Sequence, residues 1–172
     1  PKCQGDDYKQ WTNCYGEMKF PRNEYKGEWK DGKFEGRGVL KTAYGDVYVG
    51  EFKNNLAEGK GTYTYHSGNK YVGQYKNDLR VGEGIFTWAD GDKYVGQFKE
   101  DLQDGEGTYT YHSGNKYVGQ WKKNEKHGQG TLTYVSGDEY VGQFKNDVIH
   151  GQGILTWTSG AKYVGQWVRA AK

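Results

Sequence analysis

Hydrophobic and polar residues alternate along most of this chain in short runs. Tyr63 and Tyr65 are separated by threonines, and Tyr71, Gly73 and Tyr75 alternate with Val72 and Gln74. Side chains alternate between the two faces of a strand, so this spacing of two predicts β-strands. Apolar residues at helical spacing are missing throughout. The glycine-containing stretch at 66–69 predicts a hairpin turn between two strands.

The strand pairs recur at a fixed interval. Residues 61–74 read GTYTYHSGNKYVGQ, residues 107–120 repeat the same letters, and 84–97 carry a weaker copy, GIFTWADGDKYVGQ. Each copy begins 23 residues after the previous one. Self-similarity at such a period is typical of repeat proteins. Every unit begins with a tyrosine, then a glycine and an aromatic residue at spacings of two; the tyrosines are Tyr25, Tyr48, Tyr71, Tyr94, Tyr117, Tyr140 and Tyr163.

The length of the turn decides which side chains share a face. A two-residue loop at Ser67–Gly68 would place Tyr63 and Tyr65 opposite the face of Tyr71. A three-residue loop with a left-handed Gly68 would gather the tyrosines on one face. We favour the odd loop, because it concentrates the rings, and cross-strand aromatic pairs contribute about 0.2–1 kcal/mol each. The opposed glycines Gly61 and Gly73 would then leave room for the rings.

These elements predict an all-β fold, an elongated single-sheet antiparallel β-hairpin solenoid of 23-residue repeats with about thirteen strands. Residues 1–24 form an N-terminal cap with a degenerate half repeat whose turn falls near Arg22–Asn23. Residues 25–172 form the array, with six full repeats and a truncated seventh. In this register we expect Gly96 to lie beneath Phe98 and its neighbours.

Composition and charge narrow the function. The chain has 24 basic and 22 acidic residues, a formal net charge of +2, and no basic stripe, which argues against nucleic-acid binding. The even spread of charge gives only weak support to docking on anionic lipid. The chain contains no apolar stretch near the length of a membrane span.

The two cysteines, Cys3 and Cys14, both precede the first full repeat. We favour a disulfide closing a short loop, worth roughly 3 kcal/mol in the chain-entropy model. Free thiols are the alternative, and metal binding is less favoured because two thiols make half a zinc site. A disulfide would imply an oxidising compartment, with the protein exported to the periplasm, cell surface or medium and Pro1 following a removed signal peptide.

The segment Y-x-G-[EQ]-[WF]-K-x-[DN]-x-x-x-G-x-G, recurring from 25 to 167, resembles the MORN repeat. The resemblance implies an elongated sheet of hairpins that acts as a protein-binding scaffold without catalytic residues. MORN arrays accompany lipid kinases, lysine methyltransferases and membrane-junction proteins, and lipid binding has been proposed for the family. The cap residues Trp11, Asn13, Cys14 and Gly16 look like those of exported bacterial MORN proteins.

Candidate chemistry in single side chains is weak. His66 and His112 share a turn position two repeats apart, and His127 and His150 share a loop column, too far apart for one metal ion. Asp46, Asp92 and Asp138 follow turn glycines, where carboxylates usually brace the turn. We therefore expect no catalytic residue, no metal and no cofactor.

The aromatic ladder is the functional candidate. It could be only the core, or part of it could stay open as a groove for a protein or peptide. A self-assembling protein that stacks head to tail through its sheet edges, including the end at 167–172, is an alternative. A carbohydrate- or lipid-binding module is another. The groove is predicted to comprise Tyr48, Phe52, Tyr63, Tyr65, Tyr71, Tyr75, Phe86, Trp88, Tyr94, Phe98, Tyr109, Tyr111, Tyr117, Trp121, Tyr134, Tyr140 and Phe144.

Overall fold

The computed structural model describes residues 1–168, which form fourteen β-strands and one turn of 3-10 helix. The all-β class and the antiparallel hairpin repeat are therefore confirmed. The chain divides into two compact units, residues 1–89 and the residues from 90 onward. Within residues 1–168, no helix has the length and apolar character needed to cross a membrane.

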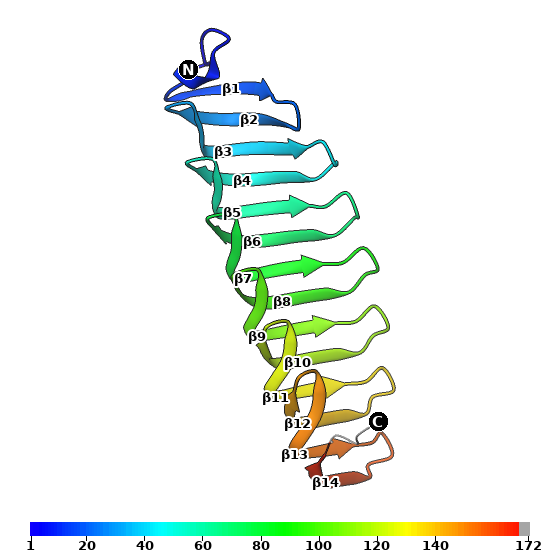
Figure 1. The fold of residues 1–172 in the computed structure, drawn as a ribbon. Helices are drawn as coiled ribbons and strands as arrows, with labels where there is room; N and C mark the ends of the chain where they lie inside the picture. Colours follow the sequence, from blue (N-terminus) through cyan, green and yellow to red (C-terminus); the bar gives the residue numbers. More distant parts are fainter. Residues whose placement is uncertain (169–172) are drawn as a thin grey trace. The chain divides into compact units, whose positions relative to one another are not determined.

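The first unit holds the cap and the first strands of the array, and each strand pairs antiparallel with the next one in the sequence (Figure 1). The longer turns, called wide turns below, lie at one end of the strands, and the shorter turns, called tight turns, lie at the other end. The elements are η1 (Tyr8–Gln10), β1 (Cys14–Lys19), β2 (Asn23–Lys30), β3 (Lys33–Thr42), β4 (Val47–Lys53), β5 (Leu56–Thr64), β6 (Lys70–Lys76) and β7 (Leu79–Thr87).

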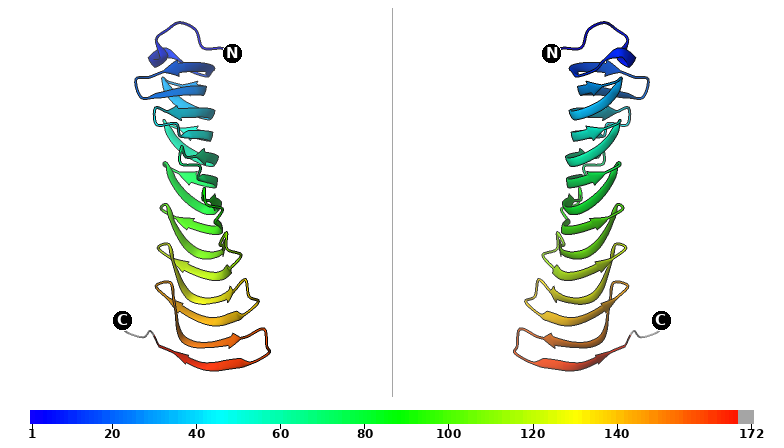
Figure 2. Two further views of the ribbon diagram at one scale, coloured as in Figure 1. Left: turned by 90° about the vertical axis from the view of Figure 1, so that its right-hand side faces the viewer. Right: turned by 90° about the vertical axis from the view of Figure 1, so that its left-hand side faces the viewer.

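The second unit repeats the same pairing of sequence neighbours. Figure 2 shows that its strands are bent into arcs rather than lying flat. A curved strand lets the rings of one face approach each other, as expected for a sheet without a covering layer. The strands are β8 (Lys93–Lys99), β9 (Leu102–Thr110), β10 (Lys116–Lys122), β11 (Glu125–Thr133), β12 (Glu139–Lys145), β13 (Val148–Thr156) and β14 (Lys162–Trp167).

The wide turn has the predicted odd length. Tyr63 pairs with Tyr71, and Gly61 lies opposite Gly73. The Tyr65 N–H donates to the Asn69 carbonyl at 2.9 Å, which leaves three residues in the loop, and Gly68 has a φ of +92°. The tyrosines therefore share one face, called the aromatic face below. Val72 lies on the opposite face and is 40% exposed.

The tight turns, which join the two strands within each repeat, have two residues, both with positive φ. At Asn54–Asn55 the φ values are +50° and +73°, as in a type I′ turn. Asn, Asp or Gly favours this conformation, yet Glu100 at +49° and Lys123 at +51° also adopt it. The equivalent turns are Asn77–Asp78, Glu100–Asp101, Lys123–Asn124 and Asn146–Asp147.

Each tight turn is also bonded to the repeat before it. The Asn124 backbone N–H donates to the Gln103 carbonyl at 2.9 Å, and the Asn124 side-chain oxygen accepts from the Gln103 N–H at 2.8 Å. Asn55 makes the same pair of bonds to Phe34. These reciprocal bonds join neighbouring repeats in addition to the strand ladder.

The cap contains a disulfide between Cys3 and Cys14, whose Cα atoms are 5.0 Å apart, so the predicted pairing is present. The bond holds the N-terminal segment beside Trp11, which is 7% exposed and donates its indole N–H to the Gln4 carbonyl at 3.1 Å. The turn between β1 and β2 falls at 21–22, because the Phe20 N–H donates to the Asn23 carbonyl. It therefore lies one residue earlier than expected.

The aromatic face as the candidate binding site

The first tyrosine of each repeat lies flat against a pair of glycines. In β4 the Tyr48 ring covers Gly50 and its cross-strand partner Gly61, and a Cβ atom on either glycine would collide with the ring. The Tyr48 hydroxyl donates to the Glu51 carbonyl at 3.0 Å. The same bond to the carbonyl three residues on is made by Tyr25, Tyr71, Tyr94, Tyr117, Tyr140 and Tyr163.

Gly96 follows the same rule, which sharpens one prediction. A Cβ at Gly96 would meet the backbone of Glu106 and Gly107 and the Tyr94 hydroxyl. The aromatic residue directly over this glycine is therefore Tyr94, which packs against Phe98 at a centroid distance of 5.2 Å and folds along its own strand.

The second aromatic residue of each repeat packs edge-on between two tyrosines. Phe52 contacts Tyr48 at a centroid distance of 5.0 Å and Tyr25 of the preceding repeat at 5.1 Å, both nearly perpendicular. Such edge-to-face pairs are worth about 0.5–1.5 kcal/mol beyond their burial. From Tyr25 to Phe144 both columns are buried and form the core of each unit, whereas Tyr163 in β14 is 44% exposed.

The seventeen predicted groove residues therefore fall into two sets. Eleven are buried, with exposures of 8% or less, and these are Tyr48, Phe52, Tyr71, Tyr75, Phe86, Tyr94, Phe98, Tyr117, Trp121, Tyr140 and Phe144. Six are half-buried, and these are Tyr63, Tyr65, Trp88, Tyr109, Tyr111 and Tyr134. The partly open surface of the aromatic face is thus built from the end of the second strand of each repeat and from the residue that follows it.

One column of aromatic residues, each directly after the end of such a strand, lies along the edge of the aromatic face and is called the rim below. In the first unit it comprises Tyr65 and Trp88, and in the second Tyr111, Tyr134 and Trp157. Trp157 is 39% exposed and was not among the predicted groove residues, although it follows Tyr134 by one repeat length. Tyr65 packs against Tyr63 at 4.5 Å, and Trp88 packs against Phe86 at 4.5 Å.

A second column, at the start of the same strands, varies in chemistry from repeat to repeat. Phe34 stacks on Tyr25 with centroids 3.8 Å apart, and the corresponding residue in the next repeat is Ala57. Arg80 places its guanidinium 5.6 Å from the Tyr71 ring. Lys126 donates to the Tyr111 hydroxyl at 3.0 Å. Sequence reasoning missed this column; its signal was variation at a position where neighbouring columns repeat.

A sequence profile of the MORN repeat matches six consecutive segments of the chain, residues 25–47, 48–70, 71–93, 94–116, 117–139 and 140–162. The chain belongs to the MORN repeat family. The match begins each segment at the tyrosine that lies on the glycine pair. No curated protein matches the chain as a whole.

Solved structures give a likeness of fold. The SAS-4 (dCPAP) TCP domain of Drosophila melanogaster, solved with a proline-rich motif of Ana2 (dSTIL), is 16% identical with a TM-score of 0.54, over 88% of this chain and 83% of that one. A mutant TCP10 domain of Danio rerio CPAP is 11% identical with a TM-score of 0.33, over 88% of this chain and 82% of that one.

The MORN motif can be explained residue by residue from this structure. In Gly59-Lys60-Gly61 the first glycine has a φ of +65° beside a register shift in the ladder. The second glycine lies under the Tyr48 ring. The two glycines therefore have different roles. Gly59 adopts the backbone conformation that bends the strand, and Gly61 leaves room for the Tyr48 ring.

The carboxylates that follow the wide turns of the MORN repeats bond to the next repeat, and Asp138 also accepts from the Ser136 hydroxyl of its own turn at 3.0 Å. Asp46 accepts from the His66 N–H at 2.9 Å and from the Tyr63 hydroxyl at 3.1 Å. The bond from the His66 backbone, followed by that from its imidazole, lowers the pKa of Asp46. Burial, and after it the bond to Asp46, raises the pKa of Tyr63 to about 12. Asp92 repeats these contacts with His112 and Tyr109.

The remaining predicted candidates do not converge on one point. His66 and His112 are exposed turn residues, each within 3.4 Å of its aspartate. His127 and His150 lie in β11 and β13 rather than in loops, directly before the bend of the strand. Asp138 accepts from the Thr158 N–H at 2.9 Å, in the same bracing role as Asp46.

Proposed function

We propose that this MORN array is a non-catalytic interaction scaffold whose rim binds an extended protein segment. The carrying observation is that the rim rings protrude beyond the buried ladder. Trp157 is 39% exposed, and Tyr65 and Trp88 are half-buried, whereas the ladder tyrosines Tyr71 and Tyr94 are fully buried. The ladder already fills the core, so the rim offers ring surface for contact.

Exposed tyrosine and tryptophan are the residue types that dominate binding energy at protein interfaces. Rows of such rings also suit proline-rich segments, because a polyproline helix is already extended and loses little entropy on binding. The TCP domain with similar fold was solved with a proline-rich motif. We therefore propose a proline-containing extended segment as the ligand class.

A peptide array of proline-rich sequences, followed by titration calorimetry on the best binders, tests this function. Replacing Tyr65 and Trp88 with alanine should weaken binding at least tenfold. The matched control replaces Val72 and Val95, which are exposed on the opposite face, with alanine. Equal loss in both double variants, or no binder in the array, would contradict the proposal.

Assembly through the sheet edges stays a prediction. Its C-terminal part at 169–172 lies outside the described residues. Sedimentation velocity over a wide concentration range tests it: a species of 19.6 kDa at every concentration contradicts self-assembly. Titration with liposomes and with glycans tests the carbohydrate- or lipid-binding alternative in the same preparation.

Export to an oxidising compartment also stays a proposal, supported by the Cys3–Cys14 pair. Fractionation of the native cells, followed by detection of this chain, tests it directly. Recovery of the chain in the reducing cytosol alone would contradict it.

A further inference from the structure

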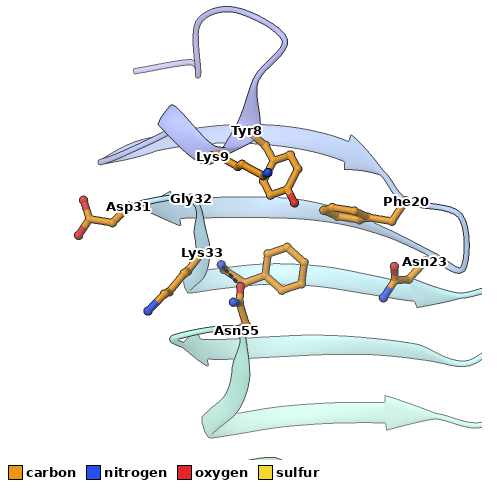
Figure 3. A pocket seen from close by; sticks show the side chains of 9 residues that line it. Tyr8, Lys9, Phe20, Asn23, Asp31, Gly32, Lys33 and Asn55 are labelled. Atoms are coloured by element: carbon orange, nitrogen blue, oxygen red, sulfur yellow. Dashed lines mark hydrogen bonds between the residues drawn. The ribbon is translucent and has the colours of Figure 1, made fainter.

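The cap and the first strands of the array line a pocket on the aromatic face of the first unit. The pocket has a volume of about 460 Å³. This is within the ordinary range for ligand sites, about 300–1,000 Å³. Helix η1 forms one wall of the pocket. The start of β3 forms the other wall, together with Asn55 of the tight turn at 54–55 (Figure 3). The lining residues are Tyr8, Lys9, Phe20, Asn23, Asp31, Gly32, Lys33, Phe34 and Asn55.

The pocket floor is aromatic. Tyr8 meets Phe20 edge-on at 5.3 Å, and Phe20 meets Phe34 at 6.0 Å. Figure 3 shows the Tyr8 and Phe20 side chains pointing toward one another. Unlike the rings of the buried ladder, all three are only partly buried. Their open surface suits one apolar side chain.

The mouth of the pocket carries an excess of positive charge. Lys9 and Lys33 are exposed, and within residues 1–168 neither forms an ion pair; Lys33 makes only a long contact of 3.4 Å to Asn54. The nearby carboxylate of Asp31 already accepts from the Thr12 hydroxyl at 3.0 Å. Figure 3 shows the Lys33 side chain directed away from the rings, so a bound carboxylate would draw this exposed lysine toward the aromatic floor. Two ammonium groups there complement a carboxylate attached close to an apolar group.

The Asn23 carboxamide adds a donor and an acceptor. Within the described part of the chain its side chain makes no hydrogen bond, although it lines the pocket. A peptide unit has one N–H and one C=O, which this carboxamide could satisfy.

We propose that this pocket binds the C-terminal residue of a peptide, with its apolar side chain on the Tyr8–Phe20–Phe34 floor and its free carboxylate between Lys9 and Lys33. The inference rests on the proposed function, since the same segment would continue along the aromatic face. It adds a fixed end point and a direction to that binding mode.

The probes are N-acetyl-phenylalanine and N-acetyl-phenylalanine amide, observed by amide chemical shifts of Gly32 and Asn55. The acid should bind at least tenfold more tightly than the amide, because only the acid carries the charge. 3-Phenylpropanoate, which has the acid and the ring but no peptide unit, should bind clearly more weakly. Equal binding of the acid and the amide, equal binding of 3-phenylpropanoate, or no binding would overturn the assignment.

Variants locate the site. Lys9→Gln with Lys33→Gln should remove the preference for the acid, and Lys53→Gln with Lys76→Gln is the control of equal charge outside the pocket. Phe34→Ala should weaken both probes at least tenfold, and the array tolerates alanine at the equivalent Ala57. An unchanged preference in the first double variant would overturn the carboxylate assignment.

The outcomes separate this inference from the proposed function. If the Tyr65 and Trp88 variant loses binding of proline-rich peptides, but the wild-type pocket binds neither probe, only the assignment of the pocket is overturned. Probe binding without any proline-rich binder would overturn the proposed function and the shared binding mode with it.

Discussion

The ring of Tyr94 rests directly on the backbone of Gly107, which pairs with Gly96 across the β8–β9 ladder. A Cβ atom at Gly107 would overlap the Tyr94 ring and hydroxyl. Tyr94 is fully buried and donates to the Gln97 carbonyl at 3.0 Å, so it has little freedom to move aside. This contact, repeated along each unit, makes the glycine a packing requirement.

Gly107→Ala should destabilise the second unit by about 1–3 kcal/mol, the usual cost of overpacking a core. Guanidinium denaturation followed by tryptophan fluorescence measures the change. The control is Thr108→Ala on the opposite face, which should change stability by less than about 0.5 kcal/mol. Equal stability of Gly107→Ala and the wild type would mean that the ring does not rest on this glycine.

Glu100→Asn should stabilise the second unit by about 0.5–1 kcal/mol. Glu100 has a φ of +49°, a conformation that asparagine adopts at lower cost. Asn54, Asn77 and Asn146 already occupy the equivalent position. The reciprocal change, Asn77→Glu, should destabilise the first unit by a similar amount. Thermal unfolding measures both, and changes of the same sign would refute the turn argument.

Tyr75→Phe should leave the ring packing intact and raise stability by about 1 kcal/mol. The Tyr75 hydroxyl is buried, and within residues 1–168 it has no hydrogen-bond partner. An unsatisfied buried hydroxyl carries a desolvation cost that phenylalanine avoids. Phe52, Phe98 and Phe144 hold the same position in other repeats. The control is Tyr71→Phe, which removes a bonded hydroxyl and should destabilise the first unit. A loss of stability in Tyr75→Phe would show that the Tyr75 hydroxyl is bonded.

Acid should weaken the bracing of the wide turns. The pKa of Asp46 and of Asp92 is lowered in the folded chain; for Asp92, hydrogen bonds from Tyr109 and His112 outweigh the opposing effect of burial. A carboxyl group with a depressed folded pKa stabilises above its unfolded pKa, and that contribution is lost as the pH falls through the folded value. The loss should therefore occur below about pH 4.

The double variant Asp46→Asn and Asp92→Asn should lose less stability than the wild type between pH 6 and pH 3. Asparagine keeps the acceptor, as Asn69 shows by accepting from the Ala89 N–H at 2.9 Å. Melting temperatures at the two pH values measure the difference, with Asp6→Asn in the exposed N-terminal loop as the control. Parallel acid profiles for wild type and double variant would contradict the prediction.

Reduction of Cys3–Cys14 should loosen the cap before the array. The loop it closes spans a sequence separation of 11, worth roughly 3 kcal/mol in the chain-entropy model. Hydrogen exchange at the Trp11 indole N–H should quicken on reduction, while exchange at the Tyr117 backbone N–H stays slow. Alkylation without reductant should leave both cysteines unlabelled; labelling would refute the pairing in solution.

Much of the repeat follows from spacing alone. The spacing of two between Tyr71, Gly73 and Tyr75 places them on one face, and the concentration of rings indicated the odd loop at 66–68. Both predictions are confirmed because strand alternation and turn parity are local geometry. The cysteine pairing is present for the same reason, since a short loop needs no distant contact.

Other features of the structure could not be predicted, because they depend on how the aromatic rings pack against neighbouring strands. Nothing in the order of residues shows that Tyr94, rather than Phe98, covers Gly96, because the choice depends on how the side chain turns along its strand. The Phe34 column was missed because its role arises only when strands curve and bring it over Tyr25. The pocket in the cap requires η1 to lie against the turn at Gly32, whose N–H donates to the Trp11 carbonyl at 2.8 Å, and no periodicity encodes this contact.

The sequence by itself determined the repeat, the strands, the shared face of the aromatic residues and the family, because periodicity and alternation are properties of the chain. The tertiary structure alone decided which rings are buried and which form the rim, and where the cap leaves a pocket. Those outcomes depend on close packing between repeats, where a single Cβ atom or ring orientation decides whether the surface is covered.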